Sequence, residues 1–115
     1  MADEKIFVVD RVVTKAGCAR AFVDKYIAEY APGGSERGMT LDRILVSPPI
    51  WSDDETNVVT ITWTVDGVES WWQMTRQGRR DPDLGRWWSR MDELVIERSR
   101  TMAAESDDVE GLSDV

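Results

Sequence analysis

The segment at residues 6–13, IFVVDRVV, is rich in β-branched side chains and has the length of a strand. Because successive side chains of a strand point to opposite faces, the segment carries one apolar set on each side. These sets are Phe7, Val9 and Val13 on one face, and Ile6, Val8 and Val12 on the other. A strand that is apolar on both faces belongs in a sheet that is covered on both faces. The fold must therefore supply two layers of cover.

An apolar stripe at helical spacing follows this strand. It consists of Ala19, Phe22, Val23, Tyr26, Ile27 and Tyr30. The sequence Ala31-Pro32-Gly33-Gly34 is poor in helix formers, so we expect the helix to end there. Residues 41–46, LDRILV, predict a second strand, which ends before two prolines that cannot donate ladder hydrogen bonds.

Residues 58–65, VVTITWTV, alternate with a period of two and predict the third strand. One face holds Val59, Ile61, Trp63 and Val65, and the other holds threonines. Asp66 and Glu69 form a capping-box pattern, which predicts that a helix begins there with Asp66 as its N-cap. Asp81-Pro82 predicts the start of a further helical segment, and residues 94–100, LVIERSR, predict a fourth strand.

The order β-α-β-β-α-β predicts an α+β fold of the ferredoxin-like type. This is a four-stranded antiparallel sheet with helices on one face and the first strand between the third and the fourth. We expect a single domain over residues 1–104 and an acidic, disordered tail over residues 105–115. Two helices cover only one face of such a sheet, so we expect a second copy of the chain to cover the other face in a homodimer.

Composition excludes several classes of function. The formal net charge of −8, with no strong basic stripe, argues against nucleic-acid binding. No apolar run reaches the roughly 20 residues of a membrane span and no signal peptide is recognisable, so we expect a cytoplasmic protein without a membrane partner. The chain has no histidine, which removes histidine-based triads and histidine-ligated metals or haem. Cys18 is the only cysteine, which excludes an internal disulfide and a cysteine metal cluster. We expect no metal and no cofactor.

The layout resembles the dimeric α+β barrel superfamily, and within it the NIPSNAP-like and antibiotic-biosynthesis-monooxygenase-like members. The resemblance spans residues 5–102 and rests on the element order, the chain length and one segment. That segment runs from Val68 through Asp81-Pro82 to Trp87-Trp88 and on to residues 91–94, MDEL. It implies that two four-stranded sheets close into a barrel across the dimer, and that each subunit keeps a small-molecule pocket between its sheet and its helices. The haem-dependent branches of the superfamily use histidine ligands, which this chain lacks.

Six tryptophans are the most unusual feature of the composition. The candidate substrate-binding tryptophans, which either line a pocket or fill the core, are Trp63, Trp71, Trp72, Trp87 and Trp88. In each adjacent helical pair only one side chain can point fully inward. Tyr26 and Tyr30 lie on the sheet-facing stripe of the first helix, where a phenol either meets a ligand or reaches water at the edge. Tyr26 is a candidate catalytic residue and Tyr30 a candidate substrate-binding residue.

Charged side chains that interrupt apolar strands supply the remaining candidates. Asp42 and Glu97 are candidate catalytic carboxylates, each able to act as a general base beside an apolar pocket. Arg11 is a candidate substrate-binding residue. The alternative is that such residues form cross-strand ion pairs, in which Arg11 or Asp10 meets Glu97 or Arg98. A basic patch near the second helix either binds a carboxylate or thioester or only keeps the surface soluble; it holds Arg76, Arg79, Arg80, Arg86 and Arg90.

Two functions remain open at this stage. The resemblance implies a cofactor-independent enzyme of the cyclase, isomerase or monooxygenase type, which acts on a small hydrophobic, aromatic or polyketide-like carbonyl compound. The alternative is a non-catalytic dimeric protein that binds a small hydrophobic ligand or serves as an accessory protein. The lack of histidine and of an evident acid–base pair favours this alternative.

Overall fold

The computed structural model describes residues 4–113 of the chain. The strands are β1 (Lys5–Thr14), β2 (Thr40–Ser47), β3 (Val58–Asp66) and β4 (Val95–Ala103). The helices are α1 (Ala19–Lys25), α2 (Ala31–Glu36), α3 (Gly67–Arg80), α4 (Pro82–Met91) and α5 (Val109–Ser113). A π-helical turn, Tyr26–Tyr30, joins α1 to α2, and a 3-10 turn, Ser106–Asp108, precedes α5. The α+β class and the predicted order of the main elements are confirmed.

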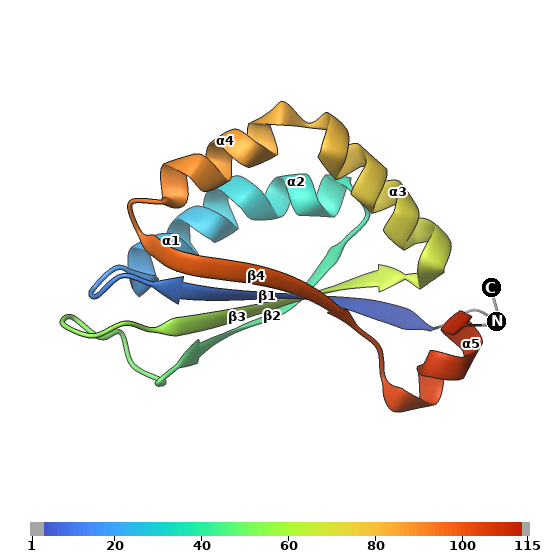
Figure 1. The fold of residues 1–115 in the computed structure, drawn as a ribbon, viewed down its shortest axis with the longest axis horizontal. Helices are drawn as coiled ribbons and strands as arrows, with labels where there is room; N and C mark the ends of the chain where they lie inside the picture. Colours follow the sequence, from blue (N-terminus) through green and yellow to red (C-terminus); the bar gives the residue numbers. More distant parts are fainter. Residues whose placement is uncertain (1–3, 114–115) are drawn as a thin grey trace.

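The strands form one antiparallel sheet in the order β2-β3-β1-β4, so β1 lies between β3 and β4 as predicted. Helices α1 to α4 all lie on one side of this sheet (Figure 1). The α3–α4 pair forms an arch, and α1 and α2 lie with it on the same side (Figure 1). Strands β2 and β4 are the two edges of the sheet, and β4 is the strand that follows α4 in the chain. Within residues 4–113, no helix is both long enough and apolar enough to cross a bilayer.

The helix-covered face of the sheet holds the core. The predicted alternation in β3 is confirmed, since its apolar set is buried and its threonines are only partly buried. On β1, Val8, Asp10, Val12 and Thr14 point into this core. Phe22 and Tyr26 from the first helical region fill the space above them. The opposite face, called the free face below, carries the other set of β1 side chains, which are partly buried or exposed.

The first helical region continues past the expected stop at residues 31–34, so that prediction is wrong. Pro32 falls in the first turn of α2, directly after the π-helical turn, where a missing backbone N–H is tolerated. The helix ends instead at Glu36, and Gly38, the residue after the C-cap Arg37, has a φ of 92° in the left-handed region. Gly38 N donates to the Ser35 carbonyl and Met39 N to the Gly34 carbonyl, the hydrogen-bond pattern of a Schellman motif.

Other boundaries also differ from the sequence predictions. Asp66 is the N-cap of α3, but its side chain makes no capping hydrogen bond. Asp81 does cap α4, because its side chain accepts from the backbone N of Asp83. Strand β4 begins one residue later than predicted and continues to Ala103. Residues 106–113, within the segment predicted to be a disordered tail, form a 3-10 turn and α5, and Leu112 and Val68 line the same hollow. Residues 114–115 lie outside the described part of the chain.

Gly34 is the point of closest approach between α2 and the sheet. A Cβ atom at this position would lie 2.7 Å from Cη2 of Trp63, whose side chain is fully buried. Gly33, one residue earlier in the same helix, faces only the flexible end of the Arg37 side chain, at 3.3 Å.

We therefore expect Gly34→Ala to lower the free energy of unfolding by about 1–3 kcal/mol, because the Trp63 ring has no room to move. Gly33→Ala is the matched control and should be neutral or raise stability by up to about 1 kcal/mol. Urea unfolding of both variants measures the difference. Equal effects at the two positions would contradict the packing described here.

Candidate functional site

A hollow of about 400 Å³ lies between α3 and the edge strand β4, and we call it the β4 hollow. Four elements line it: the end of α2, the inner side of α3, the start of α4 and the second half of β4. Its lining residues are Arg37, Trp71, Met74, Thr75, Gly78, Arg79, Leu84, Arg100 and Met102. The apolar part of the lining includes the Trp71 ring and two methionines, and the polar part consists mainly of arginine guanidinium groups.

Alternate residues of β4 hold the arch of helices to the sheet. Arg98 lies over the Trp88 ring of α4, with Cζ 4.1 Å from the ring centroid. Met102 contacts α3, since Trp71 Nε1 donates to its sulfur at 3.3 Å. Arg100, between them, reaches into the core. The β4 hollow is the space that remains between these contacts.

Arg100 forms a bidentate ion pair with Asp10 of β1. Its Nε donates to Oδ1 of Asp10 at 2.7 Å and its Nη2 to Oδ2 at 2.9 Å. Asp10 is only 4% exposed, whereas the side chain of Arg100 is 30% exposed and borders the hollow. Burial lowers the pKa of Arg100, but the hydrogen bonds and the charge of Asp10 outweigh this and raise the pKa above its usual value. The guanidinium is therefore always charged and fixed in position.

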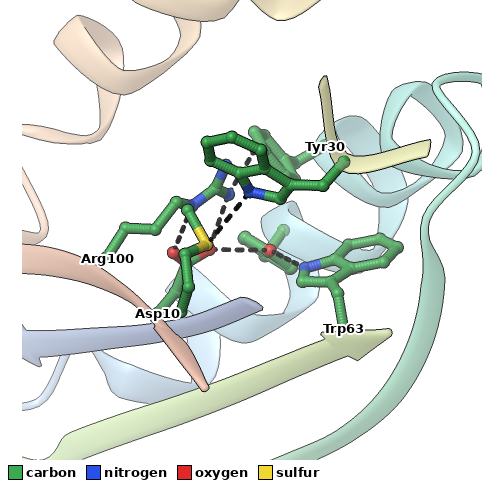
Figure 2. A network of polar contacts seen from close by, with 7 residues as sticks. Asp10, Tyr30, Trp63 and Arg100 are labelled. Carbon is green, nitrogen blue, oxygen red and sulfur yellow. Dashed lines mark hydrogen bonds and ion pairs between the residues drawn. The ribbon is translucent and has the colours of Figure 1, made fainter. Parts of the chain in front are cut away.

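Two tyrosines and a tryptophan extend this ion pair into the core (Figure 2). Arg100 Nη2 also donates to the Tyr30 hydroxyl at 3.0 Å. The Tyr26 hydroxyl accepts from Trp63 Nε1 at 2.7 Å and lies 3.5 Å from Asp10 Oδ2. Within residues 4–113, no buried side-chain polar atom lacks a hydrogen-bond partner. The network is thus satisfied by the protein itself.

Tyr26, a predicted catalytic residue, lies at the centre of this network. It is fully buried, and its ring stacks on Tyr30 with 4.7 Å between the ring centroids. Burial and the nearby Asp10 charge raise the pKa of its phenol above the ordinary value. Its phenol is a neutral hydrogen-bonding group, and its ring is packed within the core. Its hydroxyl has two partners within the protein: Trp63 Nε1 donates to it, and Asp10 Oδ2 accepts from it.

The two predicted catalytic carboxylates lie far from Tyr26. Asp42 on β2 accepts from Thr62 at 2.8 Å and pairs with Arg43, on the free face. Glu97 on β4 pairs with Arg11 at 3.2 Å, and both side chains are more than half exposed. Strands β2 and β4 are opposite edges of the sheet, so the structure does not bring these three candidates together. The cross-strand pairing of Arg11 with Glu97, which was the alternative, is confirmed.

The tryptophans divide between the core and the surface. Trp63 and Trp87 are buried, and Trp87 donates to Glu29 at 2.8 Å. Trp71 lines the β4 hollow, whereas Trp72 beside it is 43% exposed. Trp88 lies partly buried under Arg98. The prediction that only one member of each adjacent pair points fully inward is confirmed.

Sequence reasoning missed the most important residues of the hollow. Arg100 is the last residue of the predicted fourth strand and Met102 lies beyond it, so neither interrupts an apolar run within that strand. The alternation of Arg98, Arg100 and Met102 along β4 is the signal that identifies them, once the strand is extended to Ala103. Tyr30, predicted as a substrate-binding residue, lies next to the hollow through its hydrogen bond to Arg100.

The lining of the β4 hollow contains no carboxylate, histidine or cysteine. Within the described residues, no group of three or more histidine, cysteine, aspartate or glutamate side chains is placed to hold a metal ion. What the hollow offers is an apolar surface with fixed positive charge. No family model matches this sequence, no curated protein matches it, and no solved structure matches its fold.

We expect Arg100→Met to lower the free energy of unfolding by about 3–5 kcal/mol, because the buried Asp10 carboxylate loses its partner. Arg98→Met on the same strand is the control and should cost only about 1 kcal/mol. Adding Asp10→Leu to Arg100→Met should recover much of the loss. Urea unfolding measures all three, and an equal loss for the two single variants would contradict the role given to the ion pair.

Proposed function

We propose that the protein is a small-molecule-binding protein of ferredoxin-like fold, whose ligand is a small hydrophobic compound held in the β4 hollow. The observation that carries this proposal is the composition of the hollow's wall. Trp71, Met74 and Met102 provide a polarisable apolar surface of the kind that binds flat ligands. The volume of about 400 Å³ lies within the range of about 300–1,000 Å³ typical of small-molecule sites.

The proposal includes a homodimer in which two free faces pack together, as in the dimeric α+β barrels. The strand order β2-β3-β1-β4 with helices on one side is compatible with that arrangement. On the free face, Phe7, Val9 and Val13 are only partly covered within one chain. Large exposed apolar side chains continue this surface onto β2 and the loop after it: Leu45, Ile50 and Trp51. A second copy of the same chain would remove this surface from water.

The dimer is tested by placing a charge on the free face. Val9→Glu should convert a species with the mass of two chains into one with the mass of a single chain, because Val9 lies on a central strand of that face. Ile27→Glu is the matched control, since Ile27 is 50% exposed on the helical side, and it should leave the mass unchanged. Size-exclusion chromatography with light scattering measures both. A wild-type protein that stays monomeric at micromolar concentration would refute the dimer.

Binding in the β4 hollow is tested by filling it. Thr75→Phe places a ring in the hollow and should abolish quenching of tryptophan fluorescence by small aromatic compounds such as naphthalene derivatives. Gln77→Phe is the control, because Gln77 is exposed on the same helix and does not line the hollow. Saturable quenching in the wild type and in Gln77→Phe, lost in Thr75→Phe, supports the site. Quenching that survives in Thr75→Phe would place the ligand elsewhere.

A cofactor-independent enzyme acting on an aromatic or polyketide-like carbonyl compound is the second candidate. The fixed guanidinium of Arg100 beside an apolar hollow favours it, because such a group stabilises the negative charge of an enolate oxygen. The absence of a carboxylate from the lining of the hollow favours binding alone. If the protein catalyses exchange of a ketone's α-protons with deuterated water, the result supports an enzyme rather than a protein that only binds its ligand.

A further inference from the structure

We propose that the ligand of the β4 hollow carries a carboxylate, so that the protein binds small aromatic or otherwise flat apolar acids. This inference rests on the proposed function, since it names the chemical class of the ligand for the same site. It starts from a contrast of charge. The chain as a whole has 22 acidic and 14 basic residues, yet three arginines and no acidic residue line this hollow.

The donors in the hollow are not used up by the protein. Nε and Nη2 of Arg100 donate to Asp10 and Tyr30, and within the described residues its Nη1 has no acceptor. The side chain of Arg79, near the end of α3, forms no hydrogen bond or ion pair within residues 4–113. Arg37 lies with Cζ 5.6 Å from the centroid of the Tyr30 ring and likewise has no acidic partner among those residues. The wall therefore has guanidinium N–H groups that are free to donate to a ligand.

A carboxylate fits these donors better than a neutral group does. A guanidinium binds a carboxylate through two parallel charge-assisted hydrogen bonds, and it gains little from a neutral amide or alcohol. Because the apolar wall of the hollow includes the buried Met74, the attraction is weakened less by solvent than it is on an open surface. The apolar side of the same hollow would hold the body of the acid, with its ring against Trp71.

The arginine that distinguishes this ligand class is Arg79. Arg100 is committed to Asp10, and Arg37 also borders a neighbouring hollow that contains Glu29, Asp81 and Asp83. Arg79 has no such competing carboxylates and is exposed, so its replacement leaves the core untouched. Arg76 lies three residues earlier on α3, is also exposed and does not line the hollow, which makes it the matched control.

The test is isothermal titration of the full chain with 2-naphthoate and with 2-naphthamide, which has a similar shape but no charge. We expect 2-naphthoate to bind at least about tenfold more tightly than the amide, and the difference to shrink as salt is raised. Arg79→Gln should weaken 2-naphthoate binding by about tenfold while leaving 2-naphthamide within about twofold. Arg76→Gln should change neither affinity.

The two possible failures are distinguishable. Equal affinity for the acid and the amide, or an equal effect of Arg79→Gln and Arg76→Gln on 2-naphthoate, would overturn the carboxylate inference and leave the apolar site standing. If neither compound binds at millimolar concentration, the proposed function and this inference both fall. Binding of 2-naphthyl phosphate in preference to 2-naphthoate would also overturn the inference, because it would assign the site to a dianion.

Discussion

The carboxylate of Asp10 is the group on which the rest of the structure depends. It lies in the middle of the central strand β1, between Val8 and Val12, on the face that the helices cover. Burying a carboxylate in such a place lowers the stability of the fold by several kcal/mol unless a cation and further hydrogen-bond donors contact it. Arg100 meets it from β4, so the register of β1 against β4, with Asp10 opposite Arg100, is required by this pair as well as by the backbone ladder. The Tyr26 hydroxyl donates to Asp10 and the Tyr30 hydroxyl accepts from Arg100, so both tyrosines join the helical layer to this ion pair.

The candidate site follows from that ion pair. The Arg100 side chain points inward and pairs with Asp10. The next residues on the same face of β4, Arg98 and Met102, contact the arch of α3 and α4. Arg98 meets Trp88 of α4, and Met102 meets Trp71 of α3. The space between these supports is the β4 hollow, with one side of Arg100 as part of its wall. A structural salt bridge thereby leaves a positive charge at the edge of an apolar hollow.

The sequence predicts what depends on local periodicity. The alternation in β3, the stripe through Phe22 and Tyr26 and the start of a helix at Asp81-Pro82 are all visible in short stretches of chain. It does not predict contacts that depend on distant partners. Asp10 and Arg100 are 90 residues apart, and the end of α2 is decided by the φ of Gly38 and the proximity of Gly34 to Trp63. Asp42 and Glu97 were selected as interrupting charges, but only the strand order shows that they lie at opposite edges.

Indole NMR tests most directly whether the β4 hollow holds a small apolar acid. Each of the six tryptophans gives one Nε1–H signal, and Trp71→Phe identifies the signal from the hollow. Trp51 provides an internal reference, since it lies in a separate hollow beside β2. Addition of 2-naphthoate should shift the Trp71 signal in a saturable way and leave the Trp51 signal in place. A shift at Trp51 with no change at Trp71 would contradict the account.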